Sequence, residues 1–162
     1  IVDIDVEVKL PVATGNVQGS ASLTGLNGVM APFYGNVSTN FTLNHTGKGF
    51  EDVRSFVVEL FNGEKLLATN TLDIALFNGT GNAITSPFLI GREADLPSGP
   101  PANSAWTRGA YPIADKIEHT INGKLVKGMP TQDELPDKLR VTYILDGVIY
   151  IVDIDVEVKL PD

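Results

Sequence analysis

The sequence contains no cysteine and only two histidines, His45 and His119. The lack of cysteine excludes disulfides and thiol chemistry, and two histidines are too few for a histidine-rich metal centre. Neither histidine lies in a zinc or nucleophile motif, and the chain has no Gly-x-Ser-x-Gly elbow, P-loop or dinucleotide fingerprint. We therefore predict that the protein is not an enzyme.

Long apolar runs are also missing. No segment approaches the roughly 18 apolar residues of a membrane-spanning helix, so we predict no membrane span in this chain. The chain begins at Ile1 without Met, which is consistent with a mature product whose leader has been removed. We therefore expect an extracellular or cell-surface location, and four Asn-x-Ser/Thr sequons fit that expectation, at Asn36, Asn40, Asn44 and Asn78.

Positive charge is scarce as well: 12 Lys and Arg stand against 20 Asp and Glu, for a net charge of −8. A phosphate backbone would be repelled, so a nucleic-acid partner is not expected, and cations are more natural ligands. The chain is 43% hydrophobic, with 16 Gly and 10 Pro in 162 residues. These values are typical of one turn-rich globular domain.

Helical periodicity is absent, and apolar residues recur with a period of two. Residues 37–43 alternate apolar or β-branched with polar side chains, and Phe56, Val58 and Leu60 form the inward row of another strand. Three dipeptides favour type I′ hairpin turns, Asn62-Gly63, Asn122-Gly123 and Asp146-Gly147. The predicted strands cover 18–26, 37–43, 56–61, 65–71, 72–76, 84–90, 117–121, 124–126, 139–145 and 148–160.

Nine or ten strands are too many for one open sheet of this size. We predict an all-β fold, a two-sheet antiparallel sandwich of jelly-roll or Greek-key type completed by strand exchange, with a closed barrel as the alternative. Residues 91–114 are rich in proline and are predicted to form a long loop. Trp106, Arg108 and Tyr111 in it either form a contact surface or fold back over an open end of the sandwich.

The sequons Asn36, Asn40 and Asn44 are four residues apart on a predicted strand, so they share one face with Ser38 and Thr42. Two interpretations stay open, glycosylation of these sites or an outer polar face that matches the sequon by accident. Both predict that the face is exposed to solvent.

The most informative feature is a duplication: residues 1–11, IVDIDVEVKLP, recur without change as residues 151–161. We call these segments the N-terminal copy and the C-terminal copy. Each alternates strictly, so that one face of the N-terminal copy is apolar, with Val2, Ile4, Val6, Val8 and Leu10. Left unpaired, such a strand is an aggregation hazard, so it must bury this face.

The C-terminal copy has a local partner, because Asp146-Gly147 folds residues 148–160 back on 139–145. The N-terminal copy has none, and one sandwich should offer one groove for this strand. We therefore divide the chain into an N-terminal donor strand, 1–11, and a sandwich domain, 12–162. Three explanations stay open: polymerisation by donor strand, an excerpt of a tandem array with a period of 150 residues, or a strand appended to complete the fold.

The run PVATGNVQGSASLTG at 11–25, followed by APFYGNVSTNFTL at 31–43, resembles the cannula subunits with which hyperthermophilic archaea build extracellular tubes. The resemblance covers about the first third of the chain. It implies a β-sandwich subunit, donor-strand contacts between copies and assembly promoted by calcium.

The polar faces of the two copies carry the candidate metal ligands, Asp3, Asp5, Glu7, Asp153, Asp155 and Glu157. Oxygen clusters suit Ca²⁺, but one strand spaces its carboxylates about 7 Å apart and cannot wrap an ion. A site would need a second strand, a loop or a neighbouring subunit; the other interpretation is a solvated acidic face.

We therefore predict a self-assembling structural subunit of an extracellular filament or tube. The alternative is a secreted carbohydrate-binding or adhesin module, in which Trp106, Tyr111 and Tyr34 stack on sugars.

Overall fold

The computed structural model describes residues 10–24, 34–73, 81–91, 109–112, 119–121, 124–126 and 132–158. Strands dominate these residues, and the only helices in them are two short 3-10 turns. The strands are β1 (Val12–Thr14), β2 (Val17–Thr24), β3 (Tyr34–Leu43), β4 (Ser55–Asn62), β5 (Lys65–Leu72), β6 (Ala83–Gly91), β7 (Gly109–Pro112), β8 (His119–Ile121), β9 (Lys124–Val126), β10 (Lys138–Leu145) and β11 (Val148–Asp155), and the 3-10 turns are η1 (Phe50–Asp52) and η4 (Gln132–Glu134). No helix among the described residues is long and apolar enough to cross a membrane.

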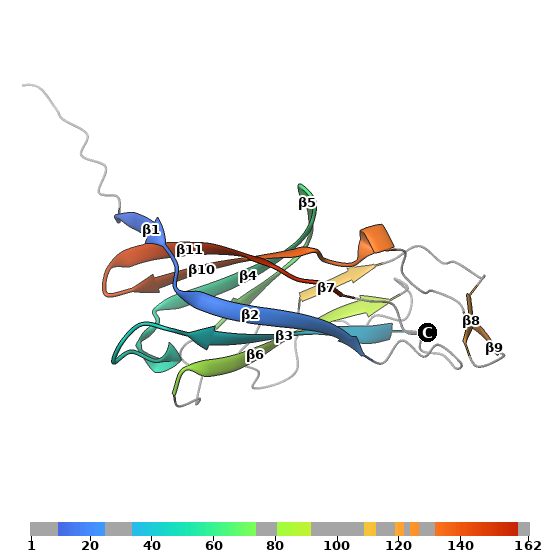
Figure 1. Ribbon diagram of the computed structural model, residues 1–162, viewed down its shortest axis with the longest axis horizontal. Coiled ribbons are helices and arrows are strands. Elements are labelled where there is room, and N and C mark those ends of the chain that lie inside the picture. The colour runs from blue at the N-terminus through green and yellow to red at the C-terminus, as the bar shows by residue number, and fades with distance from the viewer. Residues whose placement is uncertain are drawn as a thin grey trace, which may run out of the picture.

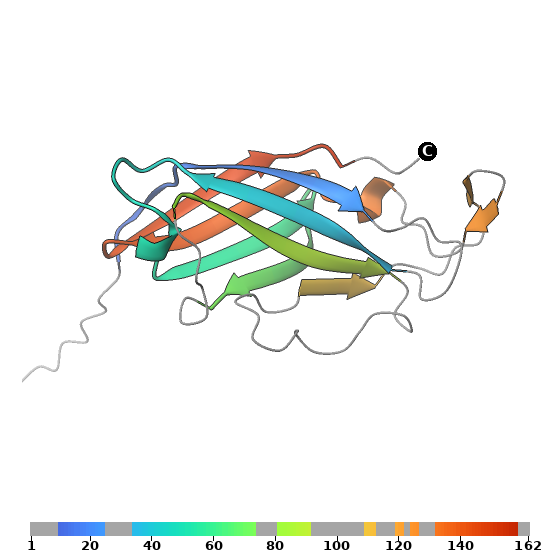
Figure 2. The same cartoon turned by 90° about the horizontal axis from the view of Figure 1, so that it is seen from below.

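Two sheets lie face to face (Figures 1 and 2). The first, sheet A, has the order β1-β11-β10-β4-β5, and the second, sheet B, has the order β2-β3-β6-β7; β8 and β9 form a separate hairpin. The predicted all-β, two-sheet sandwich is thus confirmed, while its jelly-roll or Greek-key character stays a prediction.

The core lies between the sheets because strands from both alternate apolar side chains inward. On β10 every second residue is buried, and the same alternation holds along β4. The largest fully buried side chains come from both layers: Tyr143, Phe41, Phe50, Phe56, Phe88, Leu43, Leu60, Ile90, Leu135, Leu139 and Leu145. This packing fixes how β10 presents its edge to β11.

Of the two described hairpin turns, one agrees with its prediction and the other is shifted by one residue. Asp146 and Gly147 both have positive φ, 51° and 75°, as a type I′ turn requires. At the other described hairpin the prediction is one residue out of place. Asn62 pairs with Lys65, so the turn residues are Gly63 and Glu64, and of these only Gly63 has positive φ. That pattern is typical of a type II′ turn, and the Asn122-Gly123 turn lies outside the described residues.

Most pairings are antiparallel, as the hairpins predicted, but the pairings at two sheet edges are parallel. β1 pairs with β11 in parallel, and β7 pairs with β6 in parallel. β7 also corrects the expectation of an irregular segment at 91–114, since Gly109–Pro112 completes sheet B. Of the predicted strand at 72–76, Leu72 ends β5 and Asp73 belongs to no strand, while residues 74–76 lie outside the described residues. Hairpin signals report only neighbours in sequence, so they could not reveal these long-range pairings.

Candidate strand-docking site

The C-terminal copy begins inside β11 and pairs antiparallel with β10, as predicted. The strand ends at Asp155 rather than at residue 160, although Val158 is still buried. A side-chain bond holds this end, because Gln132 Nε2 donates to the Val158 carbonyl at 3.0 Å. Of the N-terminal copy, only Leu10 and Pro11 are described; Val2, Asp3, Ile4, Asp5, Val6, Glu7 and Val8 lie outside the described residues.

The register of β1 decides where the N-terminal copy can go. Val12 lies opposite Ile149, and Thr14 lies opposite Ile151. One residue earlier, Pro11 comes level with Val148, the first residue of β11, and its carbonyl accepts a hydrogen bond from the Ile149 N–H at 2.8 Å. Beyond Val148 the chain turns back into β10, so in this register β11 offers no partner to residues 1–9 of its own molecule.

The same register leaves much of the outer edge of β11 uncovered. Gly15 N–H donates to the Ile151 carbonyl at 2.8 Å, and the chain then leaves sheet A for β2 in sheet B. Backbone groups of a strand face alternate neighbours, so the odd-numbered residues of β11 face this edge and the even-numbered ones face β10. Asp153 and Asp155 thus point their N–H and C=O groups outward, where the described part of the chain places no strand.

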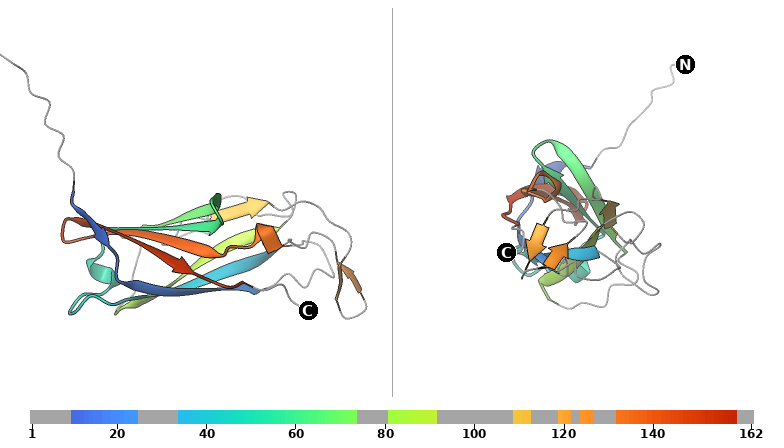
Figure 3. Two further views of the ribbon diagram at one scale, coloured as in Figure 1. Left: turned by 45° about the horizontal axis from the view of Figure 1, so that its top comes forward. Right: turned by 90° about the vertical axis from the view of Figure 1, so that its right-hand side faces the viewer.

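Beside this edge lies a seam of half-buried apolar side chains, where β11 runs next to β2, the edge strand of the other sheet (Figure 3). We call it the β11–β2 seam; it consists of Ala21, Leu23, Val152, Ile154 and Val156, all packed on the core but only partly buried. Its members come from both sheets. An apolar strand placed along the outer edge of β11 would cover them.

Small residues let β2 approach β11 closely. A Cβ at Gly19 would lie 2.7 Å from a Phe41 ring carbon and 3.1 Å from Ile154 Cδ1. A Cβ at Gly15 would lie 3.1 Å from Val152 Cβ and from the Tyr143 ring. Both glycines therefore make room for the side chains that the C-terminal copy points inward.

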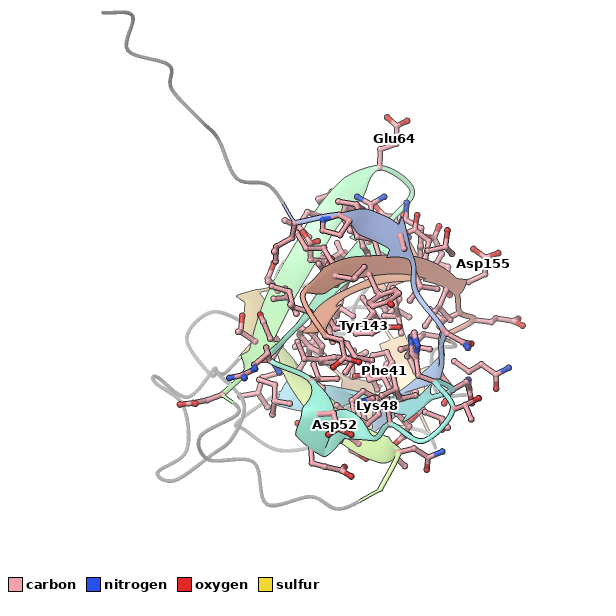
Figure 4. The ribbon with its side chains drawn as sticks, turned by 90° about the vertical axis from the view of Figure 1, so that its left-hand side faces the viewer. Phe41, Lys48, Asp52, Glu64, Tyr143 and Asp155 are labelled. Atoms are coloured by element: carbon pink, nitrogen blue, oxygen red, sulfur yellow. The ribbon has the colours of Figure 1, made fainter. Side chains whose placement is uncertain are left out.

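Tyr143 fixes the crossing from β1 to β2. Its buried hydroxyl accepts a hydrogen bond from the Asn16 N–H at 2.8 Å and lies 2.6 Å from His45 Nε2. Burial raises its pKa, because a charged phenolate would be poorly solvated there. Asn16 also exchanges two 2.8 Å bonds with Asn44, through its carbonyl and its Nδ2. Viewed from the end at which β1 begins, Tyr143 and Phe41 lie between the sheets (Figure 4).

The acidic face of the C-terminal copy points to solvent, as Asp155 does in Figure 4. Asp153 is paired with Arg140 in a two-point contact, Nε to Oδ1 at 2.8 Å and NH2 to Oδ2 at 3.3 Å. This hydrogen bond lowers the pKa of Asp153. Arg140 and Lys138 also lie 5.1 and 4.9 Å from the ring centre of Phe61.

These contacts do not build a calcium cage. Within the described residues, no three His, Cys, Asp or Glu side chains come close enough to hold a metal ion. Asp153 is already engaged by Arg140, while Asp155 and Glu157 lie exposed along the chain. Asp3, Asp5 and Glu7 lie outside the described residues.

The exposed sequon face is confirmed in part of the chain. Along β3, Val37, Thr39, Phe41 and Leu43 are buried, whereas the intervening residues are half-buried or exposed. Asn40 and Asn44 are exposed, Asn36 is half-buried and Asn78 lies outside the described residues. Trp106 and Arg108 also lie outside them, and for Tyr34 and Tyr111 only the backbone is described, in β3 and β7.

Comparison of the chain with protein-family models, with curated proteins and with solved structures found no match.

Sequence reasoning missed β1, whose three residues are too short for a periodic signal, and therefore missed its parallel register with β11. It also missed Tyr143 and Arg140. A tyrosine at an inward position of β10 was a usable signal, since a buried tyrosine hydroxyl usually has a partner.

Proposed function

We propose that the protein is a structural subunit of an extracellular filament or tube, in which the N-terminal copy of one molecule docks beside β11 of the next. The observation that carries this proposal is the short parallel pairing of β1 with β11. That pairing covers Ile149–Ile151, and no other described strand lies along this edge of β11. The role is structural rather than catalytic.

The donor strand fits the acceptor edge in direction. β1 enters at the end of the sandwich that holds the Asp146-Gly147 turn, and β11 runs from there toward the other end (Figures 1 and 3). If molecules stack end to end, a segment that precedes β1 in one molecule runs parallel to β11 of the next. The docked segment then lies along β11 of the acceptor beyond Gly15, where the acceptor's own β1 leaves the sheet.

The donor strand also fits in chemistry. Val2, Ile4, Val6 and Val8 repeat the side chains that Val152, Ile154, Val156 and Val158 already place against this core. Fully burying each such side chain is worth about 1.5–3 kcal/mol. Exchanged backbone hydrogen bonds at Asp153 and Asp155 would add to this, as in other cases of strand addition.

The identical copies provide a matched test. Ile4→Asp and Ile154→Asp make the same change in the same local sequence. We expect Ile4→Asp to abolish elongation and to leave the melting temperature of dilute, unassembled protein unchanged, because Ile4 is buried only in the neighbour. Ile154→Asp should lower the melting temperature, since Ile154 packs in its own domain.

Electron microscopy and sedimentation of both full-length variants beside the unmodified chain make the measurement. Particles of normal length from Ile4→Asp would contradict the proposal. So would a drop in melting temperature with Ile4→Asp as large as that with Ile154→Asp, because Ile4 would then be packed inside its own molecule.

Promotion of assembly by calcium stays a prediction. Because one copy does not supply a cage, an ion would have to take ligands from two molecules, for example from the acidic faces of a docked donor and of β11. The particles would then become longer in millimolar Ca²⁺ and shorten again when a chelator is added. Equal particle length under both conditions would remove calcium from the proposal.

Secretion and glycosylation belong to the same proposal. Exposed Asn40 and Asn44 are suitable acceptor positions, and intact mass of protein from its natural source tests their occupancy. The alternative, a carbohydrate-binding or adhesin module, rests on Trp106, Tyr111 and Tyr34, whose side chains are not described. No described contact favours it, and glycan binding by a monomer would be its evidence.

A further inference from the structure

The segment that lies beside β10 has an identical duplicate at the start of the chain. Residues 151–158, the described part of the C-terminal copy, have the same sequence as residues 1–8. We call the place that residues 151–158 occupy beside β10 the β10 slot. A side chain of the N-terminal copy can make there every contact that its counterpart makes, in the same register. The slot therefore suits either copy.

Polar contacts hold the C-terminal copy at both ends of the β10 slot. Arg140 binds the Asp153 carboxylate through two hydrogen bonds, and Gln132 Nε2 donates to the Val158 carbonyl at 3.0 Å. Between these contacts lies the inward row of apolar side chains that pack on the core, Val152, Ile154 and Val156. Residues 2–8 carry the same side chains at the same spacing, so a donor strand meets the same partners.

The N-terminal copy cannot fill the slot of its own molecule while β1 stays in place. Val12 lies opposite Ile149, and the strand from there to Asp155 already spans about 20 Å. Val158 lies further along the chain, held by η4 at the far end of the sandwich (Figure 2). Its counterpart Val8 is only four residues from Val12, a reach of at most about 14 Å. The copy that enters the slot must therefore come from a second molecule.

We propose that the C-terminal copy is a plug for the β10 slot, and that its release lets the N-terminal copy of a second molecule take its place. This rests on the proposed function, because it uses the same donor strand. The donor here replaces residues 151–158 instead of docking beside β11. Val148–Tyr150 precede the duplication and stay paired with β10.

The plug keeps the free subunit closed because it is tethered to its slot. A segment on a short connection has an effective concentration in the millimolar range, well above that of a second molecule in dilute solution. Once the plug has left, the donor restores the contacts that were lost, since the two sequences are identical. Exchange is therefore controlled by how firmly the plug is seated.

A cysteine on the donor reports which site it occupies, because the chain has no cysteine of its own. Arg140 and Asp153 are opposite one another, and the backbone groups of Asp153 point outward, so their Cα atoms lie about 4.5 Å apart. That spacing suits a disulfide. A synthetic peptide of residues 1–11 with Asp3→Cys should therefore cross-link to the full-length Arg140→Cys variant. A donor beside β11 would lie two strands from Arg140, about 10 Å away and too far for a disulfide.

Weakening the plug should increase this cross-link. We expect about tenfold more disulfide when Ile154→Asp is added to Arg140→Cys, because the plug then loses an apolar contact that the peptide keeps. The matched control is the same peptide carrying Ile4→Asp as well, which should show no such increase. Equal yields from the two peptides, or no increase with Ile154→Asp, overturn the plug.

A disulfide staple provides a second measurement on a chain whose plug is seated. In the full-length variant with Arg140→Cys and Asp153→Cys, oxidation fastens the plug in its own slot and reduction frees it. Binding of a fluorescent peptide of residues 1–11 at the slot should be lost on oxidation and recovered on reduction. Equal binding by the two forms overturns the plug. The proposed function is refuted separately, by normal elongation of Ile4→Asp.

Discussion

β10 and β11 are hydrogen-bonded neighbours along their whole length, yet they are buried to different degrees. Leu139 and Val141 on β10 are fully buried, while their partners Ile154 and Val152 on β11 are only half-buried. The sequences of both strands alternate equally well. The difference arises because β10 has strands on both sides, whereas the described residues give β11 a neighbour on its outer side for only three residues. Alternation thus shows which face turns inward, and only the neighbours decide how deeply it is buried.

The largest effect that would sharpen this comparison comes from truncating two paired residues. Leu139→Ala should cost about 2–5 kcal/mol of unfolding free energy, as is usual for a fully buried leucine. Ile154→Ala should cost roughly half as much, because part of its side chain is already hydrated. Urea unfolding of dilute, monomeric protein measures both, and equal costs would show that the β11–β2 seam is closed in the single molecule.

The next effect concerns the close approach of β2. Gly19→Ala should cost about 1–3 kcal/mol by overpacking, since the new methyl group would lie 2.7 Å from the Phe41 ring. Ser20→Ala, one residue along on the exposed face, is the control and should change little. If thermal melts of the two variants coincide, Gly19 does not lie against Phe41 and Ile154 as described.

Tyr143 provides a third test. Tyr143→Phe leaves the Asn16 N–H and His45 Nε2 without the hydroxyl, and a loss of about 0.5–1.5 kcal/mol is expected because these hydrogen bonds are only partly buried. The raised pKa of Tyr143 predicts a pH dependence. Because burial favours the neutral form, the stability is complete below the unfolded tyrosine pKa, near 10, and is lost as pH rises toward the folded one. Above that pH the melting temperature of the parent should fall more steeply with rising pH. The melting temperature of Tyr143→Phe should fall less steeply.

The smallest effect is expected from breaking the ion pair on the solvent-facing side of sheet A. The Arg140–Asp153 pair is partly exposed, so Asp153→Asn should cost about 1 kcal/mol or less. The lowered pKa of Asp153 means that its stabilisation is present above the unfolded carboxyl pKa, near 4, and is lost as pH falls through the folded pKa. The unfolding free energies of the parent and of Asp153→Asn, measured as the pH is lowered, should therefore converge at low pH. If the difference between them stays constant, the pair has no pH-dependent role.

The sequence predicted most of the sandwich because its signals are local. Alternation located the strands, and Asp146-Gly147 placed the C-terminal copy against β10. The sequence also showed which residues of β3 face solvent. It failed where pairing joins distant segments, as at β7 and at β1. For the candidate site it supplied the apolar face of the duplicated segment, but it could not locate the edge of β11 that β1 leaves at Gly15.

The sequence by itself thus determined an all-β chain with a duplicated amphipathic strand, because side chains in a strand alternate with a fixed period of two. The tertiary structure alone decided that β1 meets β11 in parallel at Ile149–Ile151 and then crosses to the other sheet. Register between distant strands depends on how Gly15, Gly19 and Tyr143 fit the facing layer, and such contacts leave no periodic trace in the chain. It is this register that brings Pro11 level with Val148, the first residue of β11.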